Sequence, residues 1–375
     1  MTLDVWLLGS PAAERDGHPV SLRGTKGWVL LTCLVTADRP VTRQRLARLL
    51  FPEAKDPAGA LRWNLSQLRR ELGVELDGDP VAVHLPEGTR IDVLALKSGA
   101  ATEAVELQRF GDELLAGVDD PANETLMAWL DGERRHVRGM TVDVLREAAL
   151  VHRSQGDLEQ AVHFAEACAA MDPLDENTAT LLVRCLREVG RATDAIEVAE
   201  TARRRLETEL GVTPSSALWS AAHAPINNRP AAASGRLAVE ALLDTGEAAI
   251  SAGATDAGID TLREALGASR MLDEPDVVAR SLTALGSALI HAVRGTDQDG
   301  VALLHDALPL AERAGLRSLA ARASRELGYV DMLRARYERA NWWFERSRQL
   351  ADGDDEERAW LGAFAGAART DVADF

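Results

Sequence analysis

Residues 57–72, PAGALRWNLSQLRREL, combine side chains that can contact the edges of DNA bases. At about 100° per residue, one side of a helix over this segment carries only leucines, namely Leu61, Leu65, Leu68 and Leu72. The opposite side carries Arg62, Trp63, Ser66, Gln67 and Arg70. Arg can fork two hydrogen bonds to guanine, Gln can do the same to adenine, Ser adapts, and Trp can touch a thymine methyl group. The segment therefore predicts a base-reading helix, with a solvated arginine-rich surface as the alternative.

Further basic and polar residues around this segment suit contacts to the DNA backbone. Arg43, Arg45 and Arg48 lie on the helix expected before it, where they would position the protein on phosphates without specifying sequence. Lys26 and Thr42 lie at expected helix starts, where backbone amides also favour phosphate. Arg90 follows a turn, PEGT, and is the candidate for a contact by a hairpin tip, although a residue there can also serve as a strand-edge solubiliser.

The charge of the chain is unevenly distributed. The formal net charge is −17, yet residues 1–97 hold 13 Lys and Arg against 12 Asp and Glu, while the remainder holds 29 against 47. Between Arg39 and Arg70 there are eight basic residues and two acids. A basic patch on an acidic chain indicates a polyanionic partner, because binding depends on the field where contact is made.

The elements that must position these residues form a winged helix. Apolar residues in LDVWLLGS and HPVSLRG predict strands around the turn ERDG. Helical spacing follows over residues 25–38, 42–51 and 57–72, and the last helix begins with Asp56 as N-cap and Pro57 at its first position. VAVHL and TRIDV then read as a hairpin joined at PEG. Three helices and a hairpin place the third helix in the major groove and the hairpin tip against the minor groove or backbone.

From about residue 99 onward the sequence predicts helix pairs. Gly156 and Gly190 are 34 positions apart, the tetratricopeptide period, with Ala161 and Ala195 in register. After the segment HAPINNRPAAASGR, the similar segments GIDTLREAL, GVALLHDAL and ANWWFERSRQL start at residues 258, 300 and 340, a looser period near 40 that indicates a second helical-repeat array. The predicted fold class is mainly α: an N-terminal α+β winged helix followed by all-α tetratricopeptide-like repeats. The domains expected are 1–97 for the winged helix, 98–222 and 237–375 for two helical-repeat blocks, and 223–236 for a linker.

Two quoted stretches carry a family resemblance. The run from SLRGTKGW to LSQLRRELG, followed by helix pairs that end in ETELGVTPS, resembles the Streptomyces antibiotic regulatory protein family over about residues 1–222. The resemblance implies an OmpR-like winged helix joined to a bacterial transcriptional activation domain of tetratricopeptide-like helices. It also implies that the outward residues of the 57–72 helix contact bases and that the arginines of the 42–51 helix contact the backbone. The sequence departs from the family in lacking an aromatic Gly-Tyr pair after the hairpin tip.

Several other classes of protein are disfavoured. None of the three lysines lies in GxxxxGK[ST], which excludes a P-loop, and the eight histidines form no HExxH. We expect no catalytic site, no cofactor and no bound metal. Cys33, Cys168 and Cys185 stand alone in apolar runs and are expected to be buried, reduced and structural. No stretch approaches about 18 uncharged apolar residues, so we expect a cytoplasmic protein without a membrane partner.

The function predicted from these observations is a sequence-specific transcriptional regulator, an activator that binds direct repeats in double-stranded DNA as two copies and recruits RNA polymerase through its sigma region. The alternative is a tetratricopeptide scaffold, or an effector-sensing protein, whose head binds DNA weakly or not at all. A protein or small-molecule effector at the C-terminal repeats stays open as a further partner.

Overall fold

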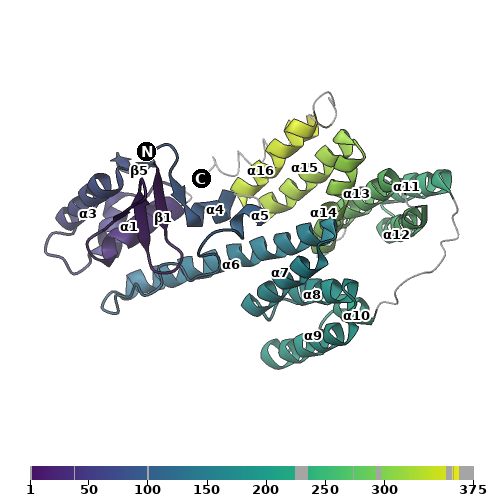
Figure 1. The fold of residues 1–375 in the computed structure, drawn as a ribbon, viewed down its shortest axis with the longest axis horizontal. Helices are drawn as coiled ribbons and strands as arrows, with labels where there is room; N and C mark the ends of the chain where they lie inside the picture. Colours follow the sequence, from purple (N-terminus) through teal and green to yellow (C-terminus); the bar gives the residue numbers. More distant parts are fainter. Residues whose placement is uncertain are drawn as a thin grey trace. The chain divides into compact units, whose positions relative to one another are not determined.

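The computed structural model describes residues 2–37, 39–98, 101–223, 235–272, 274–292, 297–351, 357 and 359–362. The chain divides into two compact units, Met1–Val144 and Leu145–Phe375, and the division falls inside the long helix α6 (Glu124–Gln155). Figure 1 shows the elements of both units. The linker predicted over 223–236 lies largely outside the described residues, and the predicted domain boundaries stay predictions.

A four-stranded sheet opens the first unit, with the strand order β3–β2–β1–β6. β1 (Leu3–Trp6) pairs antiparallel with β2 (Ala12–Arg15), which pairs antiparallel with β3 (His18–Val20). Apolar side chains alternate along β1, so that Leu3 and Val5 are buried while their neighbours are half-buried. The strand β2 was not predicted, because its sequence AAER carries little of the β-branched signal of a strand.

Three helices follow the sheet, as predicted. They are α1 (Thr25–Thr36), α2 (Arg43–Leu50) and α3 (Pro57–Leu72). Thr42 caps α2, since its hydroxyl accepts a hydrogen bond from the backbone N of Arg45 at 3.3 Å. The inward faces meet in one core, in which Leu30, Leu31, Leu46 and Leu50 are fully buried. The apolar spacing of the sequence thus located all three helices to within two residues at each end.

The expected hairpin is wrong in its pairing. β4 (Glu75–Asp77) pairs antiparallel with β5 (Ala82–His84), whereas β6 (Arg90–Ile91) pairs in parallel with β1. The turn of the hairpin is therefore the segment between residues 77 and 82, and PEG is a connection between two sheets. Leu76 is fully buried and seats the β4–β5 hairpin on the helices, which the pattern VAVHL…TRIDV does not reveal.

Short polar anchors close the first unit. α4 (Asp92–Ser98) and α5 (Ala101–Ala104) follow β6 directly. The Asp92 carboxylate accepts hydrogen bonds from the backbone N of Leu7 at 2.9 Å and of Leu8 at 2.9 Å, which ties the end of β1 to the start of α4. Burial raises the pKa of Asp92 although these bonds oppose the shift. Near the start of α6, Asn123 Nδ2 donates to the carbonyl of Leu49 at 2.8 Å.

The second unit begins with helix pairs of the predicted 34-residue period. They are α7 (Leu158–Met171), α8 (Glu176–Glu188), α9 (Ala192–Arg205) with a π-helical turn over Leu206–Leu210, and α10 (Ser216–His223). Gly156 and Gly190 both adopt positive φ, at 82° and 85°, at equivalent turns before α7 and α9. Ala161 and Ala195 are fully buried at equivalent positions, so the register read from the sequence is confirmed.

Six further helices pack as consecutive pairs (Figure 1). Their bounds are α11 (Arg236–Ser251), α12 (Thr255–Leu272), α13 (Pro275–Ala292), α14 (Asp297–Arg313), α15 (Arg317–Leu333) and α16 (Tyr337–Leu350). Glycines allow the close approach within pairs: a Cβ added at Gly300 would lie 2.7 Å from the carbonyl O of Gly286. Trp343 and Phe344 are buried between helices. The predicted fold class is confirmed.

The two helical blocks of this unit are joined by ion pairs and apolar contacts. Arg184 Nη1 in α8 lies 3.0 Å from Asp299 Oδ1 in α14, and Arg339 in α16 pairs with Glu147 in α6. Ala302 of α14 is part of the core that α7, α8 and α9 build. The C-terminal repeats are thus packed against the preceding block and form one body with it.

Candidate nucleic-acid interface

Helix α3 is seated by its leucines and closed at both ends by caps. The Asp56 side chain accepts from the backbone N of Gly59 at 2.8 Å, with Pro57 at the first helical position. At the other end Gly73 adopts the left-handed conformation, with φ of 70°. The predicted inward residues are buried, namely Leu61, Leu65, Leu68 and Leu72. The opposite side of α3 is therefore held rigidly toward solvent within this unit.

Four of the five predicted base-contacting residues share that exposed side: Arg62, Trp63, Ser66 and Arg70. The indole of Trp63 is 53% exposed, which is unusual for so large an apolar group. Arg62 Nη2 lies 3.5 Å from Asp56 Oδ2, and Arg70 Nη2 lies 2.7 Å from Glu71 Oε1. Both guanidinium groups belong to exposed side chains, so these ion pairs contribute little and a phosphate or a base edge can replace them.

Gln67 does not belong to this surface, and its predicted outward position is wrong. Its side chain is 2% exposed, and neither amide atom has a hydrogen-bond partner among the described residues. The neighbouring helix α1 covers this flank of α3: a Cβ added at Gly27 would lie 3.9 Å from Gln67 Oε1. The helical wheel places Gln67 about 100° from Leu68, a border position whose burial depends on which element packs beside it.

The arginines of α2 differ in what they contact. Arg43 donates from Nε to the carbonyl of Gly78 at 2.9 Å, and its backbone N donates to Asp79 Oδ1, so it joins α2 to the hairpin. Arg45 and Arg48 are exposed, and neither has an ion-pair partner among the residues that the structure describes. Both line a cleft of about 850 Å³ whose other wall includes Trp129 of α6. Arg45 and Arg48 therefore offer two available cations beside α3.

Two of the predicted backbone contacts are engaged within the protein. Lys26 Nζ donates to the carbonyl of Leu50 at 2.8 Å and lies 3.3 Å from Asp120 Oδ2, because the side chain folds across Phe51 toward the end of α2. Its predicted role at the start of α1 is therefore not supported by its position. Thr42 is exposed but uses its hydroxyl to cap α2.

Arg90 does not lie at a hairpin tip. It belongs to β6, where its Nε donates to Asp4 Oδ1 at 2.6 Å on the adjacent strand β1. The correction follows from the pairing of β6 with β1, which the sequence did not reveal. The Asp4 carboxylate raises the pKa of Arg90, so the guanidinium stays charged and bound at the sheet edge.

Sequence reasoning passed over two exposed cations on this unit. Arg23 precedes α1 and Lys55 precedes α3, and both are exposed without an ion-pair partner in the described part of the chain. A search for basic residues in the loops before helix N-termini would have found both, because backbone amides and a nearby cation favour phosphate together.

The cysteines are free and buried, as predicted. Burial raises the pKa of the Cys33 thiol, and it raises that of Cys185 to about 12, so both stay protonated and unreactive. Among the described residues, no group of three or more His, Cys, Asp or Glu could hold a metal ion. None of the described helices is long and apolar enough to cross a membrane.

Comparisons with known proteins find similar sequences among bacterial transcriptional regulators. A family model described as "Bacterial transcriptional activator domain" matches residues 92–224. Regulatory protein AfsR of Streptomyces coelicolor is 30% identical over 234 residues, which are 56% of this chain and 23% of AfsR. Transcriptional regulator RedD of the same organism is 33% identical over 160 residues, which are 39% of this chain and 42% of RedD. The chain thus covers less than half the length of either relative.

Among solved structures, Mycobacterium tuberculosis EmbR in complex with a low affinity phosphopeptide is 21% identical, with a TM-score of 0.46. The match covers 59% of this chain and 64% of the EmbR chain.

Proposed function

The chain belongs to the Streptomyces antibiotic regulatory protein family, and on that premise we propose that it is a transcriptional activator whose N-terminal unit binds double-stranded DNA. The observation that carries the proposal is the exposed side of α3, where Arg62, Trp63, Ser66 and Arg70 lie opposite four buried leucines. A helix so seated, with its polar side open, has the form that enters a major groove.

The proposed division of labour follows the chemistry of the side chains. Arg62 and Arg70 can fork to guanine O6 and N7, while Trp63 packs on a thymine methyl group or a sugar. Arg45 and Arg48 supply charge for phosphates, which positions the protein without selecting a sequence. Lys26 has no part in this version of the contact, because its side chain folds across Phe51 toward the end of α2 and Asp120. Arg90 has none because it lies in β6 beside β1 and not at a hairpin tip.

Electrophoretic mobility shift against the DNA upstream of the protein's own gene, with salt varied, tests the assignment. Arg62→Ala or Arg70→Ala should cost roughly 1–3 kcal/mol at the cognate site and little on random DNA. Arg45→Ala should weaken all sequences alike and lower the salt slope by about one unit. Equal losses on cognate and random DNA from both sets would contradict the assigned roles.

The arrangement on DNA is proposed to be two copies, head to tail, on direct repeats about one helical turn apart. One reading helix covers too few base pairs for useful specificity, so a second copy is needed. Inserting about five base pairs between the repeats turns one copy to the opposite side of the duplex and should abolish cooperative binding. Undiminished cooperativity after the insertion would rule this arrangement out.

Recruitment of RNA polymerase through its sigma region is the proposed route to activation. Transcription in vitro from a promoter with the repeats should rise with added protein and should stay at the basal level with Arg70→Ala. A tetratricopeptide scaffold whose head binds DNA weakly is the alternative, and it predicts neither a sequence-dependent shift nor a change in transcript level.

A further inference from the structure

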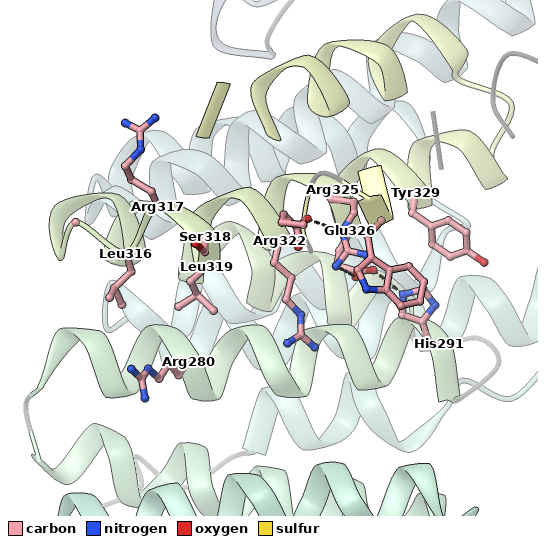
Figure 2. A pocket seen from close by; sticks show the side chains of 13 residues that line it. Arg280, His291, Leu316, Arg317, Ser318, Leu319, Arg322, Arg325, Glu326 and Tyr329 are labelled. Atoms are coloured by element: carbon pink, nitrogen blue, oxygen red, sulfur yellow. Dashed lines mark hydrogen bonds and ion pairs between the residues drawn. The ribbon is translucent and has the colours of Figure 1, made fainter. Parts of the chain in front are cut away.

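A groove runs along the C-terminal repeats between α13 and α15 (Figure 2). Its volume is about 1020 Å³. The wall on the side of α15 includes the turn 315–318 and residues of the helix at every third or fourth position, namely Leu319, Arg322, Glu326 and Tyr329, and the α13 wall contributes Arg280 and His291. Such spacing forms one continuous stripe along a helix. The groove is therefore a feature of the repeat packing and not a local gap.

The length of the groove sets the size of an occupant. The lining on this side runs from Leu316, the N-cap of α15, to Tyr329, and the 13 helical rises between them at 1.5 Å each give about 20 Å. An extended chain advances about 3.3 Å per residue, so roughly six residues span this length. A compact small molecule would fill only a part of it.

The two acidic groups in the groove share one buried arginine. Arg325 Nε lies 2.7 Å from Glu357 Oε1, and Arg325 Nη2 lies 3.2 Å from Glu326 Oε1. His291 Nε2 lies 2.5 Å from the other carboxylate oxygen of Glu326. The side chains of Arg325, Glu326 and Glu357 are all almost fully buried, so this cluster belongs to the wall. The whole lining holds four arginines against these two carboxylates, namely Arg280, Arg317, Arg322 and Arg325.

Two arginines remain on facing walls with only weak partners. Arg280 Nη1 lies 3.7 Å from Glu240 Oε1, and Arg322 Nη2 lies 3.9 Å from Glu247 Oε1. Their side chains are 46% and 40% exposed, and ion pairs of this length at such exposure contribute little. Figure 2 shows Arg322 pointing from α15 toward the helix that carries Arg280, whereas Arg317 points away. The accessible charge of the groove is thus positive, on a chain whose net charge is −17.

Apolar surface lies beside these cations. Leu316 and Leu319 are half-buried at one end of the stripe, and the indole of Trp360 is 53% exposed at the lining near Arg325. Exposed aromatic groups next to arginine are typical of surfaces that bind a partner. We propose that this groove binds an extended acidic peptide segment of a partner protein, with carboxylates on Arg280 and Arg322 and at least one apolar side chain on the leucines or Trp360.

A random heptapeptide library displayed on phage and selected on the full chain tests the proposal. Enriched peptides should carry Asp or Glu together with an apolar residue. The leading peptide, made with a fluorescent label, should bind the doubly substituted Arg280→Glu/Arg322→Glu chain at least about tenfold more weakly by fluorescence anisotropy. Arg263→Glu is the control, since it reverses the charge of one exposed arginine of α12 outside the groove, as each substitution of the double variant does inside it, and should leave affinity within about twofold.

Single substitutions and a competition experiment complete the test of the peptide groove. Arg280→Ala and Arg322→Ala, which only remove charge, should each weaken peptide binding about threefold. These single variants replace the double variant as the test if the doubly substituted chain fails to fold. Enrichment without acidic residues, or equal weakening by the Arg263→Glu control, would overturn the proposal. Displacement of the peptide by an equal concentration of a thymidine dodecamer would assign the groove to nucleic acid and overturn it too. DNA binding by α3 is not involved in any of these measurements.

Discussion

Arg153 in α6 and Asp306 in α14 form a buried ion pair, in which Nη2 lies 2.8 Å from Oδ2 and 9% of the arginine side chain is exposed. Glu188 lies on the other side of the same guanidinium, with its Oε1 3.7 Å from Nη1. The pair joins the helices matched by the activator-domain model to the C-terminal repeats. A charge buried in this way is costly once its partner is removed.

Asp306→Ala should therefore lower the free energy of unfolding of the full chain by about 2–3 kcal/mol. The loss is smaller than for a buried charge left without any partner, because Glu188 still faces the arginine. Urea unfolding followed by circular dichroism measures the loss. Glu207→Ala is the control, since it breaks an exposed pair with Arg203 and should cost no more than about 0.5 kcal/mol. Equal losses from the two variants would show that the Arg153 pair does not hold the blocks together.

The buried histidine His305, next to Asp306 in α14, makes the stability of the folded chain depend on pH. Burial, followed by the charges of Arg153 and Arg346, lowers the pKa of His305 to about 3 from its ordinary 6.5. Below pH 6.5 the unfolded chain therefore binds a proton at His305 that the folded chain does not bind. The contribution of the neutral histidine to the free energy of unfolding is fully present above pH 6.5 and is lost as pH falls toward 3. Between pH 7 and pH 5 the loss is about 2 kcal/mol.

His305→Gln should remove this part of the pH dependence. The urea unfolding midpoint of each protein is measured at pH 7 and at pH 5. The difference between the two pH values should be larger for the wild type than for the variant. His163→Gln alters an exposed histidine and should leave the wild-type dependence unchanged. A variant whose midpoint falls with pH as steeply as that of the wild type would contradict the assignment to His305.

How far the sequence predicts this molecule depends on whether a feature is local. Thr42 was read only as a helix start with a phosphate contact, although it caps α2. The N-cap Asp56 and the 34-residue spacing of Gly156 and Gly190 were visible, because each requires a particular residue at a particular place beside one helix. The burial of Gln67 was not visible in the sequence, since it depends on α1 lying beside that side of α3. The partner of β6 was missed for the same reason: a two-residue strand carries no pattern that selects its neighbour.

The small residues of the C-terminal repeats recur at two positions in each repeat, and only one of them was used in reading the period from the sequence. The period near 40 was read from similar segments that start at residues 258, 300 and 340, three residues inside α12, α14 and α16. The glycines on the helices paired with these, Gly246, Gly286 and Gly328, recur with nearly the same period. Small residues on both helices of each pair permit the close approach, so a search for two interleaved small-residue positions would have located the pairs as well as the period.

Gly300→Ala tests this close approach. The added Cβ would lie 2.7 Å from the carbonyl O of Gly286 and 2.7 Å from Cγ1 of Ile290, so α13 and α14 must separate, at a cost of about 1–3 kcal/mol. The gain in helix propensity, about 1 kcal/mol, does not offset the larger values. The thermal unfolding midpoint should therefore fall.

Gly267→Ala is the matched control for that substitution. Gly267 lies within α12 and an added Cβ would meet nothing within 4 Å, so the same change should raise stability by up to about 1 kcal/mol through propensity alone. Shifts of the same sign at both positions would show that contact between the helices does not decide the effect of Gly300→Ala.

The last prediction separates Gln67 from the surface that we assign to DNA. Its amide is buried, and both polar atoms lack hydrogen-bond partners among the described residues, which costs about 1–3 kcal/mol. Gln67→Met keeps the length of the side chain and removes the amide, so it should stabilise the N-terminal unit by about 1–2 kcal/mol and change cognate DNA affinity by less than about twofold. Arg70→Ala, one turn away on the exposed side, should do the reverse: stability is nearly unchanged while affinity at the cognate site falls. If Gln67→Met instead loses cognate binding about tenfold without loss on random DNA, the side chain must turn outward when DNA binds, and the base contact first predicted for it would be right.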